Sequence, residues 1–346
     1  MDNFEEYLRQ GEPKKAEKAK LWKTAIGLQQ VDGLKPSEYL IETAKQNIEG
    51  DITIEEVKQR IDSYYKQHPT TSPDEDRTEE ADKVSARIAE ILSEQTFTFS
   101  PAEYLTIHRR LFKGIYKFAG KIRDYNITKK EWVLNGETVL YGSAESLKAT
   151  LEYDFEQEKR FSYKGLSKQE TIEHIAHFIS YLWQIHVFGE GNTRTTAIFL
   201  IKYLRTFGFE LNNDLFAEHS WYFRNALVRA NYKNYINNIH TTSEFLLRFF
   251  ENLLLGENHT LKNREMHIHF PDTVKIQNDT VKSEIDTVND TVFSLIKQKK
   301  EITASEIGKR LDMSLSTVKR KIKELKEQKI IERVGSDKTG YWKIVE

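Results

Sequence analysis

The chain has 346 residues, enough for two or three domains, and its 52 Lys and Arg residues nearly balance its 53 Asp and Glu residues. The net charge of −1 gives no overall field that would attract nucleic acid or a membrane surface. The absence of cysteine excludes disulfides and cysteine-ligated zinc, and no apolar run is long enough to span a bilayer. The first residues lack the basic and apolar regions of a signal peptide, so we expect a cytoplasmic protein with no membrane partner.

Residues 1–67 have the pattern of a small helical module. The pattern of residues 16–28 predicts one helix, and Gly33 is the expected stop signal after it. A second helix is expected to begin around Pro36. Thr53 and Glu56 have the spacing of a capping box at the start of a third helix. The polar residues 68–80 contain two prolines and predict a linker.

Residues 80–260 are patterned mostly as helices, with one signal for strands. The apolar residues Trp132, Val133 and Leu134 precede an Asn-Gly pair, and residues 137–141 (ETVLY) follow it. Residues of this kind around an Asn-Gly turn predict a β-hairpin. The chain as a whole is therefore expected to be mainly α, with a single hairpin in its central domain.

The most informative stretch is residues 186–200, HVFGEGNTRTTAIFL. Gly189 and Gly191 free the backbone to take positive φ, so that its N–H groups can converge on an anion in front of the following helix. Arg194 can supply a countercharge to a phosphate, and Glu190 can hold a divalent metal that bridges phosphate oxygens. The sequence thus predicts helix, anion-binding loop and helix, with His186 at the entrance of the loop.

Residues 286–346 have a different character. Three helical patterns are followed by two short strand patterns around a Gly-containing turn, and the third helix carries many lysines, including Lys319, Lys321, Lys323 and Lys326. This order resembles a winged helix-turn-helix, with Ser316, Thr317 and residues 319–321 near the start of a recognition helix. Duplex DNA is the expected partner, and a winged helix used for protein contacts is the alternative.

The stretch at residues 186–194 resembles the core motif of the Fic family, H-x-F-x-[DE]-[GA]-N-[GK]-R-x-x-R. The positions that match in register are His186, Phe188, Glu190, Gly191, Asn192 and Arg194. The resemblance implies a Fic-type helical core with a β-hairpin flap, and transfer of AMP from ATP to a Ser, Thr or Tyr hydroxyl of a target protein, auto-modification included.

The same resemblance assigns roles to residues. His186 would be the catalytic base and Glu190 would hold Mg²⁺. The nucleotide would be bound by Gly189, Gly191, Asn192, Thr193 and Arg194. The flap residues Trp132, Val133 and Leu134 would dock an extended segment of the target by strand addition.

The sequence departs from the motif twice, because Thr193 replaces the usual Gly or Lys and Ala197 stands where a second arginine is expected. Residues 1–67 also resemble the small antitoxins that inhibit some Fic toxins through a helix with the motif [ST]-x-x-x-E-[GN]. Here Leu28 and Asp32 occupy the Ser/Thr and Glu positions, which makes Asp32 and Gly33 candidate regulatory residues. Because position 197 has no charge, we expect Asp32 to be exposed or to cap the turn at Gly33, with weak inhibition at most.

Two other functions remain open at this point. One is a transcription regulator whose Fic core senses nucleotide with little or no transferase activity. The other is a Fic enzyme that uses a different nucleotide or removes AMP. A helical packing domain without regulatory function is the alternative for residues 1–67. We therefore assign three domains: residues 1–67, residues 80–260 and residues 286–346.

Overall fold

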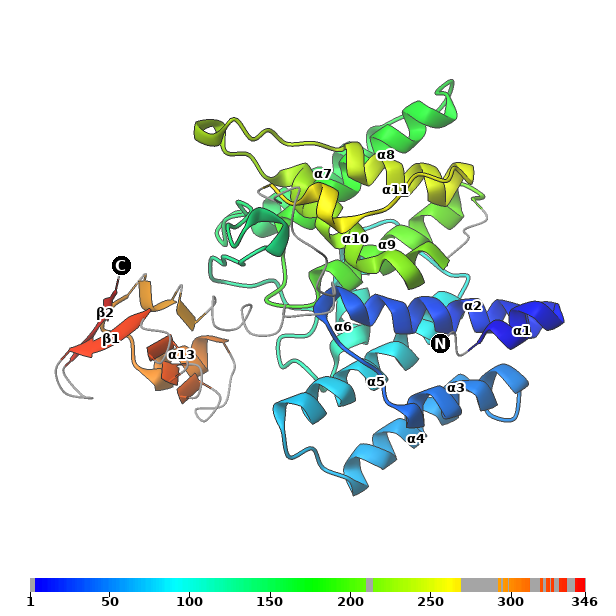
Figure 1. Ribbon diagram of the computed structural model, residues 1–346, viewed down its shortest axis with the longest axis horizontal. Coiled ribbons are helices and arrows are strands. Elements are labelled where there is room, and N and C mark those ends of the chain that lie inside the picture. The colour runs from blue at the N-terminus through cyan, green and yellow to red at the C-terminus, as the bar shows by residue number, and fades with distance from the viewer. Residues whose placement is uncertain are drawn as a thin grey trace.

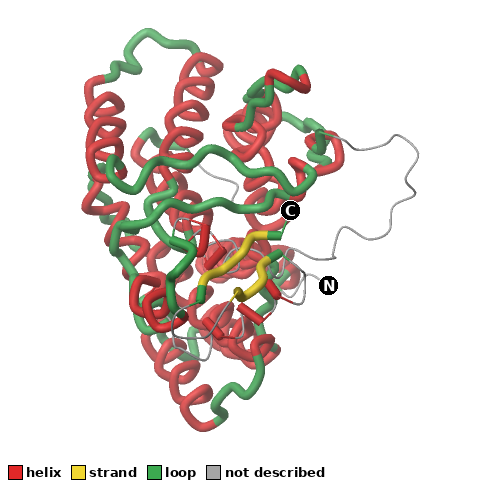
Figure 2. Tube along the Cα trace, turned by 90° about the vertical axis from the view of Figure 1, so that its left-hand side faces the viewer, coloured by secondary structure: helices red, strands yellow, loops and turns green. Residues whose placement is uncertain are grey.

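The computed structural model describes residues 4–209, 214–268, 292–293, 295–297, 299–311, 318–319, 322–323, 325–326, 330–334 and 340–345. Helices dominate this part of the chain, and the strands within it form one short pair (Figure 2). The predicted mainly α class is therefore confirmed. Among the described residues, no helix combines the length and the apolarity that crossing a bilayer requires.

The first part of the chain forms helices where capping signals predict them. Ser37 Oγ accepts a hydrogen bond from the N–H of Leu40 at 3.1 Å, and Thr53 and Glu56 form a complete capping box. The elements are α1 (Glu5–Gln10), α2 (Pro13–Gly27), the 3₁₀ helix η1 (Leu28–Asp32), α3 (Glu38–Glu49), α4 (Ile54–Gln67), α5 (Pro73–Ser93) and α6 (Pro101–Phe112).

The predicted linker over residues 68–80 is too long. Helix α5 begins at Pro73, with Ser72 as its N-cap and acidic residues throughout its first turn. A serine cap, a proline at the first helical position and acids beside the helix N-terminus all stabilise a helix start. The polar composition of residues 73–80 therefore belongs to an exposed helix end.

The second part of the chain places one helix at the centre of the molecule. The elements are η2 (Trp132–Leu134), α7 (Leu147–Arg160), α8 (Lys168–Ile185), α9 (Asn192–Thr206), α10 (Asp214–Asn231), η3 (Tyr235–Asn237), α11 (Glu244–Leu255) and η4 (Asn263–Met266). Residues 192–204 of α9 are all buried, and α5, α6 and α8 pack around this helix. Its polar first turn is accommodated because other helices supply partners: Tyr104 bonds Thr196 Oγ1 at 2.8 Å, and Trp183 Nε1 donates to Thr193 Oγ1 at 3.0 Å.

Residues 4–67 are packed against the central helices and share their core. Helix α2 lies along α5 and crosses α10 (Figure 1). At the crossing, a Cβ on Gly27 would lie 2.3 Å from the Ala217 Cα, so only glycine permits this approach. Ser220 Oγ donates to the Gly27 carbonyl at 2.8 Å. The contact brings η1, at the end of α2, directly onto α9.

The hairpin predicted around residues 132–141 is wrong as a pair of strands, although its turn forms. Asn135 and Gly136 have φ of 55° and 86°, as an Asn-Gly turn requires. Trp132–Leu134, however, form the 3₁₀ turn η2, and Val133 and Leu134 are fully buried. Burial of these two side chains in the core outweighs strand pairing, which leaves a compact turn closed by bonds between Glu131 and residues 136 and 137.

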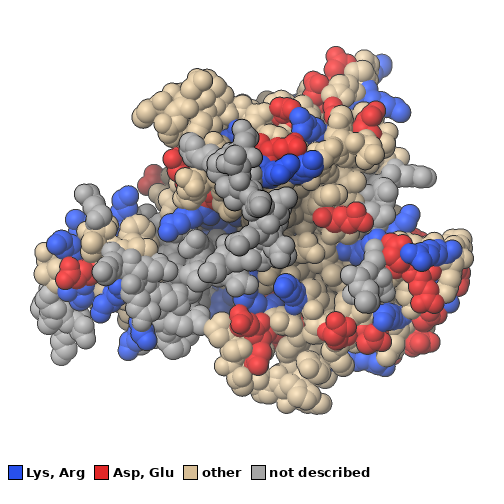
Figure 3. All heavy atoms as spheres, in the orientation of Figure 1, with Lys and Arg blue, Asp and Glu red and all other residues tan. Residues whose placement is uncertain are grey.

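The C-terminal part confirms the predicted hairpin of the winged helix-turn-helix. Strands β1 (Ile331–Val334) and β2 (Tyr341–Ile344) pair antiparallel after helix α13 (Ala304–Leu311). Val318, Ile322 and Leu325 are buried, whereas Lys319, Lys323 and Lys326 are exposed, which is the pattern of a helix with a basic outer face. Lys and Arg side chains are numerous on the C-terminal part of the chain in Figure 3. Ser316, Thr317, Arg320 and Lys321 lie outside the described residues.

Candidate active site

His186 lies at the end of α8, where the motif loop begins. It is the C-cap residue of α8, has φ of 52°, and is 2% exposed. Its Nδ1 lies 3.2 Å from the Trp183 carbonyl, which can only accept, so the proton is on Nδ1. The buried Nε2 has no partner among the described residues. The ring therefore presents an unshared lone pair, as a general base requires.

The electrostatic surroundings keep this imidazole neutral. Burial, together with the nearby charges of Lys129, Arg123 and Arg224, holds the pKa of His186 well below its usual range. Tyr141 packs against the ring, with 4.3 Å between the ring centroids. The imidazole is thus neutral and its orientation is fixed.

Asn192 fixes the loop rather than pointing out of it. Its Oδ1 accepts from the Phe188 N–H at 3.0 Å and its Nδ2 donates to the Phe188 carbonyl at 2.8 Å. The resemblance assigned Asn192 to the nucleotide, but both ends of this amide are engaged within the loop. Thr193 is likewise engaged by the Trp183 indole. Both residues therefore act as positioning residues in this structure.

Two further buried residues outside the motif also hold the loop. His108 accepts from the Gly120 N–H at Nδ1 and bonds the Glu190 carbonyl through Nε2 at 3.0 Å, while its ring stacks on Phe188. Burial lowers the pKa of His108 to about 3, so it is a neutral structural group. Arg123 donates to the carbonyls of His186, Tyr125 and Gly142.

The two glycines of the loop are needed for different reasons. Gly191 has φ of 76°, and a Cβ there would lie 2.4 Å from the Phe112 ring. Gly189 is not in the left-handed region, but a Cβ there would lie 2.5 Å from the Tyr125 hydroxyl. Gly191 is also the N-cap of α9, so the first N–H groups of that helix face the loop without intrahelical acceptors. The positive φ predicted for both glycines is thus found at Gly191 alone, and the start of α9 lies directly behind it.

Glu190 is the acidic residue of the loop and is paired with a lysine from the segment before η2. Its Oε1 lies 3.3 Å from Lys129 Nζ, and the two side chains are 19% and 8% exposed. No cluster of three or more acidic, His or Cys ligands exists among the residues that the structure describes. A single carboxylate that already holds a cation fits a Mg²⁺ ion whose other ligands are phosphate oxygens and water.

Arg194 is fully buried and is held by residues far away in the sequence. Its Nη2 donates to Glu80 Oε1 at 2.7 Å, its Nη1 donates to Gln29 Oε1 at 3.1 Å, and its guanidinium lies over the Phe112 ring. Asp32 Oδ2 lies 2.7 Å from Arg194 Nε, an ion pair that is close but not aligned as a hydrogen bond.

The expectation that Asp32 is exposed or caps the turn at Gly33 is therefore wrong. The Asp32 side chain is 24% exposed and faces Arg194. Arg77 also donates to the Asp32 carbonyl at 2.7 Å, which ties η1 to α5. The physical reason is that α2 delivers η1 to the first turn of α9, where Arg194 is the partner of the carboxylate. Gly33 ends η1 with φ of 66°.

The predicted target-docking residues are mostly inaccessible. Val133 and Leu134 are fully buried, and the Val133 carbonyl accepts from the Ile268 N–H at 3.0 Å. Trp132 is 36% exposed and its ring contacts His267. The exposed apolar side chain of this region is Leu140, at 83%. The Val133 carbonyl is thus bonded within the chain itself, and Glu137 and Leu140 are the exposed residues of the following segment.

A buried ion pair fixes the turn of residues 131–137 beside the base. Glu131 is fully buried, lies 2.6 Å from Arg224 Nη1 of α10, and accepts a hydrogen bond from Tyr141 at 3.0 Å. Sequence patterns could not identify Glu131, Arg224, Lys129 or Glu80 as site residues, because they lie far from the motif in the sequence, on α5, on α10 and on the segment before η2. The available signal was a charged residue within an otherwise apolar or aromatic run, as at Arg224 in SWYFRNALV.

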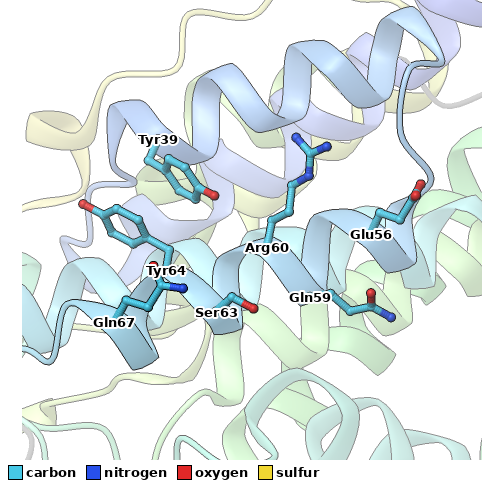
Figure 4. A pocket seen from close by; sticks show the side chains of 7 residues that line it. All are labelled: Tyr39, Glu56, Gln59, Arg60, Ser63, Tyr64 and Gln67. Carbon is cyan, nitrogen blue, oxygen red and sulfur yellow. The ribbon is translucent and has the colours of Figure 1, made fainter.

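A separate pocket of about 570 Å³ opens between α3 and α4 and includes no motif residue (Figure 4). Tyr39 and Tyr64 stack along one side of it, with 4.2 Å between ring centroids. The polar side chains that complete its lining are Glu56, Gln59, Arg60, Ser63 and Gln67.

The curated relatives of this chain are named adenylyltransferases. Over 142 residues the chain is 27% identical to protein adenylyltransferase VbhT of Bartonella schoenbuchensis. The matched stretch covers 41% of this chain and 27% of VbhT. Over 161 residues it is 27% identical to probable protein adenylyltransferase y4lH of Sinorhizobium fredii. That match covers 46% of this chain and 79% of y4lH. The chain thus spans about a quarter of the length of VbhT.

Two solved structures share low similarity with the chain. The N-terminal FIC domain of the Bep8 protein from Bartonella sp. 1-1C is 19% identical with a TM-score of 0.43, and the match covers 54% of this chain and 88% of that one. A Fic family protein from Desulfovibrio desulfuricans G20 is 12% identical with a TM-score of 0.44, covering 99% and 94%.

Family models match both regions in which the sequence carries motifs. The model of the Fic/DOC family matches residues 98–204, which include the loop from His186 to Arg194. The model of an HTH domain matches residues 288–341, which include α13 and β1 and end at the first residue of β2. The chain therefore carries a Fic/DOC family domain at residues 98–204, followed by an HTH domain at residues 288–341.

Proposed function

We propose that this protein is an adenylyltransferase that transfers AMP from ATP to a Ser, Thr or Tyr hydroxyl of a target protein, itself included. The observation that carries the proposal is the buried Nε2 of His186, which has a free lone pair at the entrance of a loop built to hold an anion. A pure nucleotide sensor has no need of a base there. The names of VbhT and y4lH support the same reaction class.

The proposed reaction is an in-line displacement at the α-phosphorus. The target hydroxyl oxygen forms a bond to the α-phosphorus as the bond from that phosphorus to the β-bridging oxygen breaks, and pyrophosphate leaves. His186 Nε2 takes the hydroxyl proton, while Nδ1–H stays bonded to the Trp183 carbonyl. The N–H groups at the start of α9 stabilise charge on the phosphate oxygens.

Glu190 is the residue that would hold Mg²⁺, and a bound Mg²⁺ would neutralise charge on the phosphates. Arg194 reaches the phosphates only after its contacts with Asp32 and Glu80 are broken. Residues 1–67 would therefore act as a regulatory module, residues 80–260 as the catalytic domain and residues 286–346 as the DNA-binding domain.

The reaction is tested by incubating the full chain with ATP, GTP, CTP or UTP labelled at the α-phosphate. Label is expected on protein from ATP, with pyrophosphate released in equal amount. Absence of protein label from every nucleotide would overturn the proposal. Label from another nucleotide, or release of AMP from adenylylated protein, would favour the alternative Fic reactions.

The second candidate function is transcription regulation through the HTH domain. The observation in its favour is the set of exposed lysines Lys319, Lys323 and Lys326 opposite the buried residues of the same helix. The two functions are compatible, because they use different domains. A nucleotide-dependent change in DNA affinity, with no protein labelling, would favour the regulator alone.

A further inference from the structure

Lys129 is a nearly buried cation to which the proposed reaction gives no role. Its side chain is 8% exposed, and its own N–H donates to Thr138 Oγ1 at 3.1 Å, which fixes the segment that carries it. Its Nζ lies 3.3 Å from Glu190 Oε1. The charge of Lys129 also acts on His186, where it lowers the pKa more than any contribution except burial. The ammonium therefore lies close to both the proposed base and the proposed metal carboxylate.

The other cations around the loop are already committed. Arg194 faces two carboxylates, those of Asp32 and Glu80. Arg123 donates its hydrogen bonds to backbone carbonyls, and Arg224 forms an ion pair with the buried Glu131. Position 197 is a buried alanine and adds no charge. A polyphosphate that enters this loop thus meets few cations that can turn towards it.

Lys129 differs from these arginines in how it is held. An ammonium has three donors, and Glu190 is its one side-chain or backbone partner among the described residues. A divalent ion at Glu190 would take that partner away. An ammonium left without an anion in a site of low exposure is costly, so it would turn to the nearest available anion. The flexible four-carbon stem of lysine allows that movement.

We propose that Lys129 is a phosphate-binding residue: its ammonium is paired with Glu190 before nucleotide binds and moves to phosphate oxygens when a nucleoside polyphosphate with its divalent ion is bound. The inference rests on the proposed function, because the ligand is the nucleotide of that reaction. Lys129 thus supplies, from the segment before η2, a cation that the motif lacks at Ala197.

The main competing explanation is that Lys129 only neutralises Glu190. Changing Glu190 to Gln removes the carboxylate and therefore separates the two functions. We would measure the affinity for ATP by calorimetry, with Mg²⁺ for wild type and K129M, where the ion releases Lys129, and in EDTA for E190Q and the double variant E190Q/K129M, where the substitution releases it. Lys130→Met is the matched control, since Lys130 is the neighbouring lysine and is exposed. Lys129→Arg tests whether another cation suffices, and circular dichroism establishes that each variant is folded.

The proposal expects K129M to weaken ATP binding about tenfold or more, also in the E190Q background, because a charge-assisted contact contributes about 1.5–3 kcal/mol. The ATP affinity of K129R should stay within about threefold of the wild-type value, a margin of about 0.7 kcal/mol, and that of K130M within about twofold. Equal affinities of E190Q and E190Q/K129M would overturn the inference alone. If wild type does not bind ATP with Mg²⁺, the proposed function falls as well.

Discussion

The two ends of the motif loop balance their charges in different ways. At one end, Arg194 is fully buried and faces two carboxylates and an amide supplied by η1 and α5. At the other end, Glu190 is partly exposed and faces one lysine at 3.3 Å. Breaking the ion pairs of a buried charge with several partners costs much free energy. Breaking one longer ion pair between partly exposed side chains costs little, so such a charge can exchange its partner. We therefore expect the N-terminal helices to control the Arg194 end, and the Glu190 end to accept a new ion more readily.

His186, the proposed base, lies at the entrance of the loop, so removing its imidazole should stop the reaction and leave the ion pairs of Glu190 and Arg194 intact. His186→Ala is expected to lower the rate of protein labelling by about a thousandfold or more, within the range for general-base catalysis. ATP affinity should change little, since Nε2 has no partner among the described residues, whereas the melting temperature should fall because the bond to the Trp183 carbonyl and the contact with Tyr141 are lost. Labelling at the wild-type rate would show that another group takes the proton.

The Glu190 end should respond to metal concentration. Glu190→Ala is expected to lower the labelling rate by about a hundredfold, comparable to the loss of one charge-stabilising group in an active site. Raised Mg²⁺ should restore part of the rate, because phosphate oxygens and water can still hold the ion more weakly. His186→Ala is the control and should show no such recovery. A rate that does not depend on Mg²⁺ in either variant would argue against a metal at Glu190.

The Arg194 end should respond to its carboxylates. Asp32→Ala is expected to raise ATP affinity about tenfold, or about 1.4 kcal/mol, since it removes one of two charges that hold Arg194. Glu80→Gln should add to this gain. Asp62, an acidic residue whose side chain is 60% exposed, is a control in which the change to Ala should have no effect. Unchanged affinity in Asp32→Ala would mean that Glu80 alone sets the position of Arg194.

The pH profile tests the protonation state of His186, the proposed base. The groups that face His186 are the cations Lys129, Arg123 and Arg224, with Tyr141 and its partner Glu131. A pKa lowered by burial and these cations keeps the imidazole neutral below pH 6.5, so the acid limb of kcat/KM should lie below that value. Lys129→Met should move the limb to higher pH. A wild-type limb at or above pH 6.5 would contradict this electrostatic account.

The smallest expected effect lies outside the loop, in the HTH domain. Lys319→Ala in the full chain should lower the slope of log affinity for duplex DNA against log salt by about one unit. Binding is expected to be weak, because residues 286–346 hold only a modest surplus of basic residues. Nucleotide at the loop should leave this slope unchanged. If no duplex binds the full chain at low salt, the domain is better explained as a protein-binding module.

The sequence alone was sufficient wherever a feature depends on neighbours within about four residues. Ser100 and Ser167 cap helices at the positions that local patterns favour, and Asn135 and Gly136 take the positive φ that their turn requires. The motif loop is local in the same sense, because two glycines and a following helix define its backbone. The loop and the helix that follows it form where the motif predicts them, although Asn192 and Thr193 turn inward, and the functions of the loop residues stay predictions.

Only the tertiary structure decided the partners of the charged groups. Gln29 and Arg194 are 165 positions apart, and Lys129 and Glu190 are 61 apart, so no periodicity or spacing predicts that they meet. The same holds for residues 132–134, where burial in a core assembled from distant helices outweighed a local preference for strands. The sequence determined which groups can do chemistry, and the packing of α2 against α10 and of η1 against α9 determined which of them are paired, since those contacts form only when distant segments fold together.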